Sequence, residues 1–314
     1  MATETMNPSK LAKFFSDEDA ARDLLEEMRW GKTPTCPHCG GLEPYKLTPK
    51  ATSKKPGRKG LYKCKACRKQ FTVTVGTVFE DSRIPISKWL LAIHLIGSSK
   101  KGMSAHQIHR NLGISYKAAW FMMHRLRYAM KQGPLSGLMK GNVEIDETYV
   151  GGKQRHVKSG RPGSESNKTP VVALVERGTG RVRAGTMARI TADNLTRVIE
   201  EHVAHNATMM TDDYHLYKRV AEATGNKHFT TNHSKYEYVR GNVHSNTVEG
   251  FFSLLKRGIN GVYHHVSQGH LNRYCDEFAF RYENRKMDDG QRAELLVAGA
   301  EGKRLTYKQP ASVS

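Results

Sequence analysis

The chain has 314 residues, of which 38% are hydrophobic and 25% are charged, so it can form folded cores and its length suggests about two domains. Lysine and arginine number 50 against 30 acidic residues, a formal net charge of +20, which favours a polyanionic partner such as nucleic acid. The N-terminal residues MATETMNPSK lack the apolar segment of a secretory signal. The longest apolar run, residues 89–97, is too short to span a bilayer. These features argue against membrane and secreted proteins.

The first predicted element is an amphipathic helix within residues 1–30. Ser16 precedes three acidic residues, and such a residue can cap a helix whose acidic first turn complements the helix dipole. Leu24, Leu25 and Met28 then recur at helical spacing.

Two CxxC pairs follow, in a region that we assign to residues 31–80. They hold four of the five cysteines: Cys36, Cys39, Cys64 and Cys67. The odd total argues against a disulfide framework. Four thiolates in two such pairs predict a structural, tetrahedral Zn²⁺ site with no open position for catalysis; redox dithiols are the alternative. His38, inside the first pair, is expected at the surface.

The segment between the two pairs is strongly basic. Ten lysine and arginine residues and no acidic residue occur from position 46 to position 69. The central part of this segment is expected to form a long solvated hairpin loop. Such a run can be only a solvated surface, but on a zinc ribbon of a basic protein we interpret it as contacting phosphate, through residues that include Lys54, Lys55, Arg58 and Lys59.

Residues 82–131 are predicted to be helical throughout. The pattern gives helices at 86–96, 104–112 and 116–130, with Gly113 opening a tight turn before the last one. This order is typical of a helix-turn-helix DNA-binding domain, although a plain helical linker can share it. The last helix offers four candidate DNA contacts: Lys117, His124, Arg125 and Arg127.

From about residue 140 the pattern changes to alternating strands and helices. Strands are expected at 142–146, 170–176, 181–188, 207–212 and 227–230, and helices at 191–204, 214–223 and 245–257. Together these elements predict an α/β layered domain over residues 140–286, and hence an α+β multidomain protein. The polar residues 287–314 are expected to form a loosely packed tail.

Two carboxylates occupy positions where a strand should bury apolar side chains. Asp146 ends one apolar strand and Asp212 ends another, and charge is costly there unless a cation is nearby. If the two strands are neighbours, both acids meet at one edge of the sheet, where Mg²⁺ would relieve their repulsion. The last predicted helix offers a third acid, Glu249, with Lys256 two turns after it and Asn246 one turn before it.

The order of these features resembles a known family. A zinc ribbon, a helix-turn-helix and then Asp, Asp, Glu and Lys is similar to bacterial insertion-sequence transposases with a DDE catalytic domain, in particular the 1595-type (ISXO-like) group. The strings that carry the resemblance are IDETYVGGK, TDDYHLY, HSNTVEGFFSLLKRGINGVYHHVS and HLNRYCDEFAFRYENR. Thirty-six residues lie between Asp212 and Glu249, and six between Glu249 and Lys256, spacings typical of these enzymes. The resemblance covers roughly residues 20–285.

The resemblance implies a ribonuclease-H-like catalytic core. Asp146, Asp212 and Glu249 would bind Mg²⁺ or Mn²⁺ for cleavage of DNA at the ends of the element and for transfer of the 3′-hydroxyl into target DNA. Lys256 would contact a DNA phosphate. Some members of the group use asparagine as the third ligand, so Asn246 is the alternative to Glu249, which we prefer for its charge and its spacing to Lys256.

The implied partners are double-stranded DNA, both element ends and target, and further copies of the chain, at least a dimer on DNA. The implied location is the bacterial cytoplasm, in association with the nucleoid and with no membrane. A zinc-ribbon and helix-turn-helix regulator without catalysis is the alternative from another class, but it gives no reason for three acids at these positions. An inactivated or domesticated transposase is a third interpretation.

Other residues have less definite roles. Asp213 is a competing strand ligand, but strand alternation directs it away from the face of Asp212. The family often has asparagine where this chain has Glu283, after Tyr282. Four histidines are candidates for positioning phosphate or water, although each is as easily a packing or surface residue: His244, His264, His265 and His270.

Overall fold

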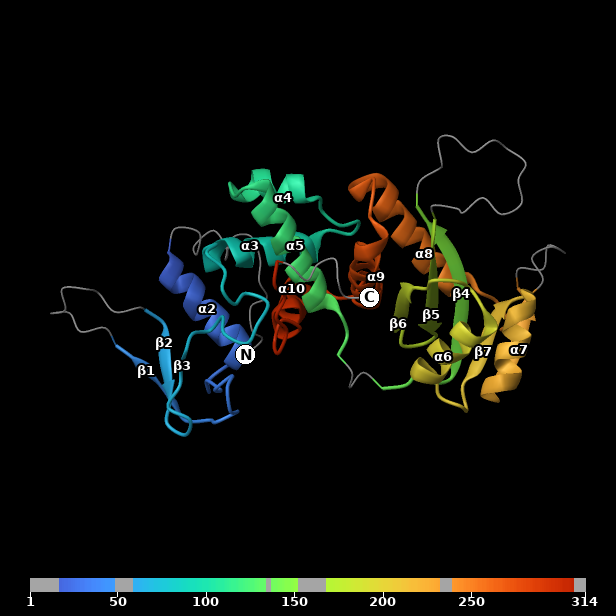
Figure 1. The fold of residues 1–314 in the computed structure, drawn as a ribbon, viewed down its shortest axis with the longest axis horizontal. Coiled ribbons are helices and arrows are strands. Elements are labelled where there is room, and N and C mark those ends of the chain that lie inside the picture. Colours follow the sequence, from blue (N-terminus) through green and yellow to red (C-terminus); the bar gives the residue numbers. More distant parts are fainter. Residues whose placement is uncertain (1–16, 49–58, 134–136, 152–167, 232–238, 308–314) are drawn as a thin grey trace. The chain divides into compact units, whose positions relative to one another are not determined.

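The computed structural model of the protein describes residues 17–48, 59–133, 137–151, 168–231 and 239–307. These residues form two compact units (Figure 1). The first unit holds the described residues up to Met130 and those from Met287 onward, and the second unit runs from Lys131 to Lys286. In sequence terms the second unit is therefore inserted into the first. Within the described part of the chain, no helix has both the length and the apolar character needed to cross a membrane.

The first unit begins with a helix and a small sheet. Helix α2 (Glu18–Trp30) starts at Asp17, whose carboxylate accepts hydrogen bonds from the backbone N–H groups of Asp19 and Ala20. The predicted cap, Ser16, lies outside the described residues. Strands pair in the antiparallel order β1-β2-β3. Their bounds are Pro44–Leu47, Leu61–Cys64 and Gln70–Phe71.

The predicted basic hairpin is present as the pair β1–β2. Its tip, including Lys54, Lys55 and Arg58, lies outside the described residues. Lys59, just beyond the tip, is described and forms an ion pair with Asp19.

Three helices follow at the predicted places, which confirms this part of the sequence analysis. They are α3 (Ile86–Ser98), α4 (Ala105–Leu112) and α5 (Tyr116–Met130). Helix α4 is capped by the hydroxyl of Ser104 and ends at Gly113, which adopts a left-handed conformation (φ 58°). A residue with a Cβ is strained in that conformation, so the glycine makes the tight turn between α4 and α5.

The expectation of a loosely packed tail after residue 286 is wrong. Helix α10 (Asp289–Ala298) begins with a capping box formed by Asp288 and Gln291 and packs against α3 within the first unit. Farther on, Glu301 accepts hydrogen bonds from the guanidinium of Arg29 on α2, at 2.5 and 2.7 Å. The segment is polar in composition, but five of its apolar side chains are buried: Ala293, Leu296, Val297, Ala300 and Leu305.

The second unit is built on a five-stranded sheet in the order β6-β5-β4-β7-β8. The strands are β4 (Asn142–Val150), β5 (Thr169–Glu176), β6 (Val182–Thr186), β7 (Thr208–Asp212) and β8 (Lys227–Thr231). The first three are antiparallel, and β7 and β8 run parallel to β4. This topology is that of the ribonuclease-H-like fold, as expected. Strand β4 continues to Val150, so Asp146 lies inside it rather than at its end, because the residues ETYV remain paired with β5.

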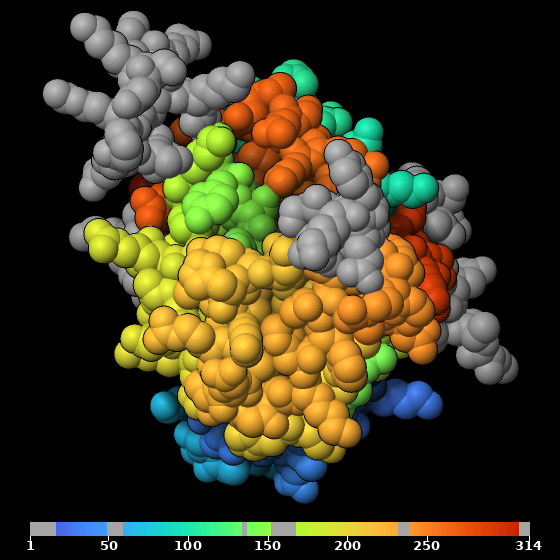
Figure 2. Space-filling view, turned by 90° about the vertical axis from the view of Figure 1, so that its right-hand side faces the viewer, coloured from blue at the N-terminus to red at the C-terminus, as the bar shows by residue number. Residues whose placement is uncertain are grey.

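Helices cover both faces of this sheet (Figure 1). They are α6 (Ala192–His202), α7 (His215–Thr224), α8 (Asn246–Gly258), the π-helical turn η3 (Ile259–Tyr263) and α9 (Gln268–Glu283). Val143 and Ile145 of β4 share one core with α6 and α7, whereas α8 and α9 form the core of the opposite face. The even-numbered residues of β4 therefore face α8. Figure 2 views the second unit from the side of α7, whose colour and that of the segments next to it in the chain cover much of the surface facing the viewer.

Candidate active site

Asp146 and Asp212 lie on the same face of the sheet, on neighbouring strands. Strands β4 and β7 are parallel, and the last residues that pair them with each other are Glu144 and Met210. Each aspartate therefore lies two positions beyond this last β4–β7 pair. Met209 packs in the core of the α6 and α7 face, and alternation therefore directs Asp212 to the α8 face with Asp146. Asp213 is exposed and follows the end of β7.

The surroundings of Asp146 disfavour its ionised form. Burial, above all, and the charges of Glu147, Asp212 and Glu249 together raise its pKa to about 7, although a hydrogen bond of 2.8 Å from the backbone N–H of Glu147 acts in the opposite direction. The mutual repulsion of such carboxylates is relieved by a hard cation that takes oxygen ligands. The donor set therefore fits Mg²⁺ or Mn²⁺.

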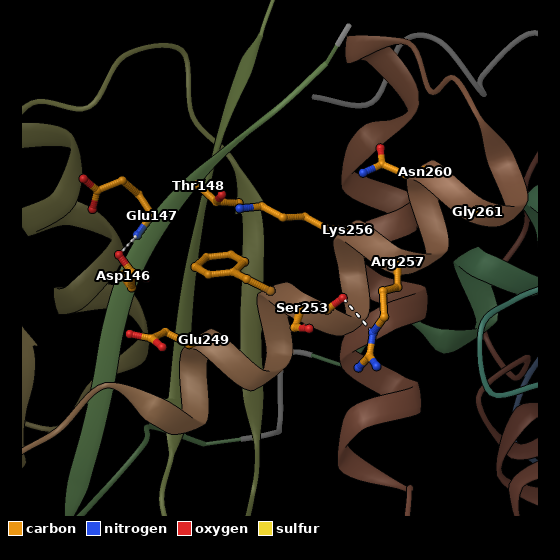
Figure 3. Close-up of a pocket in the computed structure, with 10 residues that line it drawn as sticks. Asp146, Glu147, Thr148, Glu249, Ser253, Lys256, Arg257, Asn260 and Gly261 are labelled. Atoms are coloured by element: carbon orange, nitrogen blue, oxygen red, sulfur yellow. Dashed lines mark hydrogen bonds between the residues drawn. The ribbon is translucent and has the colours of Figure 1, made fainter. Parts of the chain in front are cut away.

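An open groove of about 690 Å³ runs from β4 along α8 and η3 (Figure 3). Its lining residues are Asp146, Glu147, Thr148, Glu249, Phe252, Ser253, Lys256, Arg257, Asn260 and Gly261. In Figure 3 the carboxylate of Glu249 is directed toward Asp146, and the side chain of Lys256 extends toward Thr148. Asn246 is exposed at the start of α8 and does not line the groove. The structure thus brings Asp146, Glu249 and Lys256 together and leaves Asn246 outside.

Two further acids of β4 were not predicted from the sequence. Glu147 directs its side chain away from Glu249 and Lys256 (Figure 3) and accepts a hydrogen bond from the hydroxyl of Tyr217 on α7. Burial raises the pKa of Glu147. Glu144 is fully buried and ion-paired with Arg177. Neither role could be read from the sequence, because the partners of both acids come from distant segments.

The four predicted cysteines converge in the first unit. The Sγ atoms of Cys36 and Cys67 lie 3.7 Å apart, and those of Cys39 and Cys64 lie 3.6 Å apart. A tetrahedral zinc ion with bonds of about 2.3 Å separates its sulfur ligands by about 3.8 Å, so the four sulfur atoms fit zinc. Among the residues that the structure describes, these cysteines are the one group of three or more potential ligands whose donor atoms lie within 4.8 Å of one another.

Backbone hydrogen bonding acts on one thiol of the second CxxC pair, and His38 is not part of the cluster. The pKa of Cys64 is lowered to about 7, chiefly by a hydrogen bond from the backbone of Cys67, which favours the thiolate that binds metal. His38 is exposed, as predicted, with its ring edge against Phe71.

Comparison with known proteins gives the family. Residues 16–70 match the family model for a transposase zinc-ribbon domain, and residues 138–283 match the model for an ISXO2-like transposase domain. The chain thus carries a transposase zinc-ribbon domain followed by an ISXO2-like transposase domain. It is 29% identical over 283 residues to an uncharacterized protein in transposable element ISH50 of Halobacterium salinarum. The matched region covers 86% of this chain and 92% of that protein.

Among solved structures, the transposase is similar to the HTLV-2 integrase catalytic core domain in complex with magnesium (dimeric form). The sequence identity is 12% and the TM-score is 0.27, over 45% of this chain and 84% of the integrase core.

In the helix-turn-helix of the transposase, three of the four predicted DNA contacts are wrong. His124, Arg125 and Arg127 are 0%, 7% and 2% exposed. Arg125 donates to the backbone carbonyl of Glu80 at 2.9 Å and lies over the ring of Phe121. The second half of α5 packs into the core on most of its sides, so basic residues there serve packing. Lys117, in the first turn, is exposed.

The remaining candidates of the transposase lie outside the groove. The Nδ1 atom of His244 lies 3.3 Å from Glu144, whereas His264, His265 and His270 do not line the groove. Glu283 accepts a hydrogen bond of 2.6 Å from the backbone N–H of Val182. Glu283 therefore attaches the end of α9 to the edge strand β6, which is a structural role.

Proposed function

We propose that this transposase cleaves DNA at the ends of its insertion sequence and transfers the freed 3′-hydroxyl into target DNA. The observation that carries the proposal is the set of carboxylates Asp146, Asp212 and Glu249, whose charges act on one another, with Asp146 and Glu249 lining a groove that Lys256 also lines. A regulator that only binds DNA has no use for these acids, because burial and the neighbouring carboxylates raise the pKa of Asp146 to about 7.

The three carboxylates would hold Mg²⁺ or Mn²⁺. Such ions, when bound, activate water or a 3′-hydroxyl and stabilise the leaving oxygen of a phosphodiester. Glu249 is the third ligand rather than Asn246, because Glu249 borders the groove and accepts a hydrogen bond of 3.1 Å from Ser245 that orients it. Lys256 binds a phosphate of the strand in the groove as a point charge.

The first unit supplies DNA recognition in this proposal. Its zinc ribbon holds structural Zn²⁺ through the four cysteines, and its helix-turn-helix reads the element ends with the exposed start of α5. Tyr116 there is 45% exposed and its ring stacks on His106 of α4 at 4.3 Å, with Lys117 beside it. The first residues of the second helix of such a motif contact base edges.

An element has two ends, so a complex that joins both to a target requires at least two copies of the chain. Acting on bacterial DNA, the transposase associates with the nucleoid.

The test is metal-dependent cleavage of a duplex that carries the inverted repeats flanking the gene. The full-length protein with Mg²⁺ or Mn²⁺ is expected to nick this duplex at the repeat boundary and leave a 3′-hydroxyl. Asp146→Asn and Glu249→Gln are expected to bind the duplex as the wild type does and to cut it at least a hundredfold more slowly, about the scale of losing transition-state charge stabilisation. Sequence-specific binding without cleavage in any divalent metal would favour a regulator instead.

A further inference from the structure

A fully buried carboxylate lies two residues before Asp146 on β4. Glu144 is 0% exposed and shares the α8-facing side of the strand. It accepts hydrogen bonds from the backbone N–H groups of Thr247 and Val248, at 2.7 and 3.0 Å, and from the hydroxyl of Thr247 at 2.7 Å. Arg177 also donates to it.

The two backbone N–H donors belong to the first turn of α8. The first N–H groups of a helix have no partner within the helix, and a side chain usually satisfies them. The N-cap residue Ser245 directs its hydroxyl to Glu249 instead, at 3.1 Å. Glu144 therefore caps α8 from the sheet, and its negative charge lies at the positive end of the helix dipole. This arrangement leaves Ser245 available to orient Glu249.

Arg177 fixes the chain that enters the same helix. It follows β5, and its guanidinium donates to the backbone carbonyls of Asn242 and His244, at 2.5 and 2.6 Å, as well as to Glu144. One ion pair thus holds both the segment before α8 and the first turn of α8 against the sheet.

Glu144 connects Asp146 and Glu249 through only a few covalent bonds and one hydrogen bond. Asp146 is two residues from Glu144 along a single strand, and Val248, which donates to Glu144, directly precedes Glu249. A small displacement of the first turn of α8 therefore moves the carboxylate of Glu249 relative to Asp146.

We propose that Glu144, supported by Arg177, is a positioning residue that sets the place of Glu249 relative to Asp146. The inference rests on the proposed role of these acids as metal ligands. Glu144 itself does not line the groove, so it acts through α8. Outer partners that orient metal ligands typically change metal affinity by about 10–100-fold when they are replaced.

The experiment measures Mn²⁺ binding to the full-length protein without DNA, by electron paramagnetic resonance of the free ion, together with a thermal melt of each variant. Glu144→Gln is expected to raise the Mn²⁺ dissociation constant by about 10–100-fold. Glu283→Gln is the matched control, because Glu283 is also a backbone-bonded carboxylate of the second unit but holds α9 to β6. It is expected to leave Mn²⁺ affinity unchanged. Loss of stability alone lowers the melting temperature, not the affinity of the folded protein.

A double variant shows whether Glu144 changes Mn²⁺ affinity through Glu249 or independently of it. If Glu144 acts through Glu249, Glu144→Gln combined with Glu249→Gln binds Mn²⁺ no more weakly than Glu249→Gln alone. If Glu144→Gln unfolds the protein, Glu144→Asp replaces it throughout, because the shorter carboxylate keeps its charge but cannot reach both N–H groups. Losses that multiply in the double variant, or unchanged affinity in the single variant, would overturn the inference.

The two proposals fail in different ways. If the wild type binds no Mn²⁺, or binds it equally well after Asp146→Asn, the metal site itself is refuted, and with it both the proposed function and the role of Glu144. If Asp146→Asn abolishes binding while Glu144→Gln has no effect, the metal site stands and only the positioning role of Glu144 falls.

Discussion

At the scale of residues, the ionised form of Asp146 opposes folding when no cation is bound. Its pKa in the folded protein is about 7 against an ordinary value of 3.8, so between these values the folded state binds the proton more tightly than the unfolded state. The free energy of unfolding therefore falls as the pH rises from about 4 to about 7, and the loss is complete above that range.

Asp146→Asn is accordingly expected to stabilise the metal-free protein at pH 8, by about 1–4 kcal/mol, and to change stability little near pH 4, where the wild-type group is already protonated. Mg²⁺ is expected to raise the melting temperature of the wild type but not that of the variant. Thermal melts at both pH values, with and without Mg²⁺, measure both effects. A variant that melts at or below the wild type at pH 8 would contradict the argument.

The sequence predicted some of these residues because their chemistry is unusual for their place. An aspartate in an apolar strand, and a glutamate seven residues before a lysine on an amphipathic helix, stand out without any structure. Glu144 does not, because its role depends on Thr247 and Val248, which are a hundred residues away in the chain. Arg125 and Arg127 were wrongly predicted to contact DNA. Basic residues on a predicted recognition helix indicate DNA contacts, but these two side chains are buried.

At the scale of elements, strands and helices with a clear apolar period were predicted from the sequence, and those with a weak one were missed. Helix α9 buries polar residues such as Arg273 and Glu277 as well as apolar ones, so its period is masked. That β4 and β7 are neighbours, which brings Asp146 and Asp212 together, could only be assumed from the sequence, because strand order depends on long-range pairing.

The exposed start of α5, just after the turn from α4, leads to a prediction about DNA recognition. Tyr116→Ala and Lys117→Ala are each expected to lower the affinity for element-end DNA by about tenfold, the scale of one base contact, with little change in melting temperature because both side chains are exposed. Lys218→Ala is the control, since Lys218 is an exposed lysine on α7 of the second unit. Fluorescence anisotropy with element-end and scrambled duplexes measures the effect. Losses no greater than that of the control would place recognition elsewhere.

At the scale of the whole molecule, the chain enters the second unit after Met130 and returns to the first unit at Met287. The first unit therefore cannot be completed until the catalytic unit has been synthesised. The returning segment is joined to the rest of the first unit by several specific contacts. Glu301 pairs with Arg29, Lys303 donates to the carbonyl of Ala129 at 3.0 Å, and Arg304 pairs with Asp81.

This organisation predicts that substitutions that destabilise α10 weaken DNA binding but leave metal affinity unchanged. Leu296 is 1% exposed and its neighbour Leu295 is 39% exposed, so the two leucines form a matched pair on one helix. Leu296→Ala leaves a cavity in the first unit and is expected to lower its free energy of unfolding by about 2–5 kcal/mol. Leu295→Ala is expected to cost within about 0.5 kcal/mol, as surface changes usually do.

Chemical unfolding followed by tryptophan fluorescence reports on the first unit specifically, because all three tryptophans of the chain, Trp30, Trp89 and Trp120, belong to it. Binding of element-end DNA is expected to weaken in Leu296→Ala at temperatures where the first unit begins to unfold, whereas Mn²⁺ affinity stays at the wild-type value, because its ligands lie in the second unit. Equal stability of the two leucine variants would show that α10 is not part of the folded first unit.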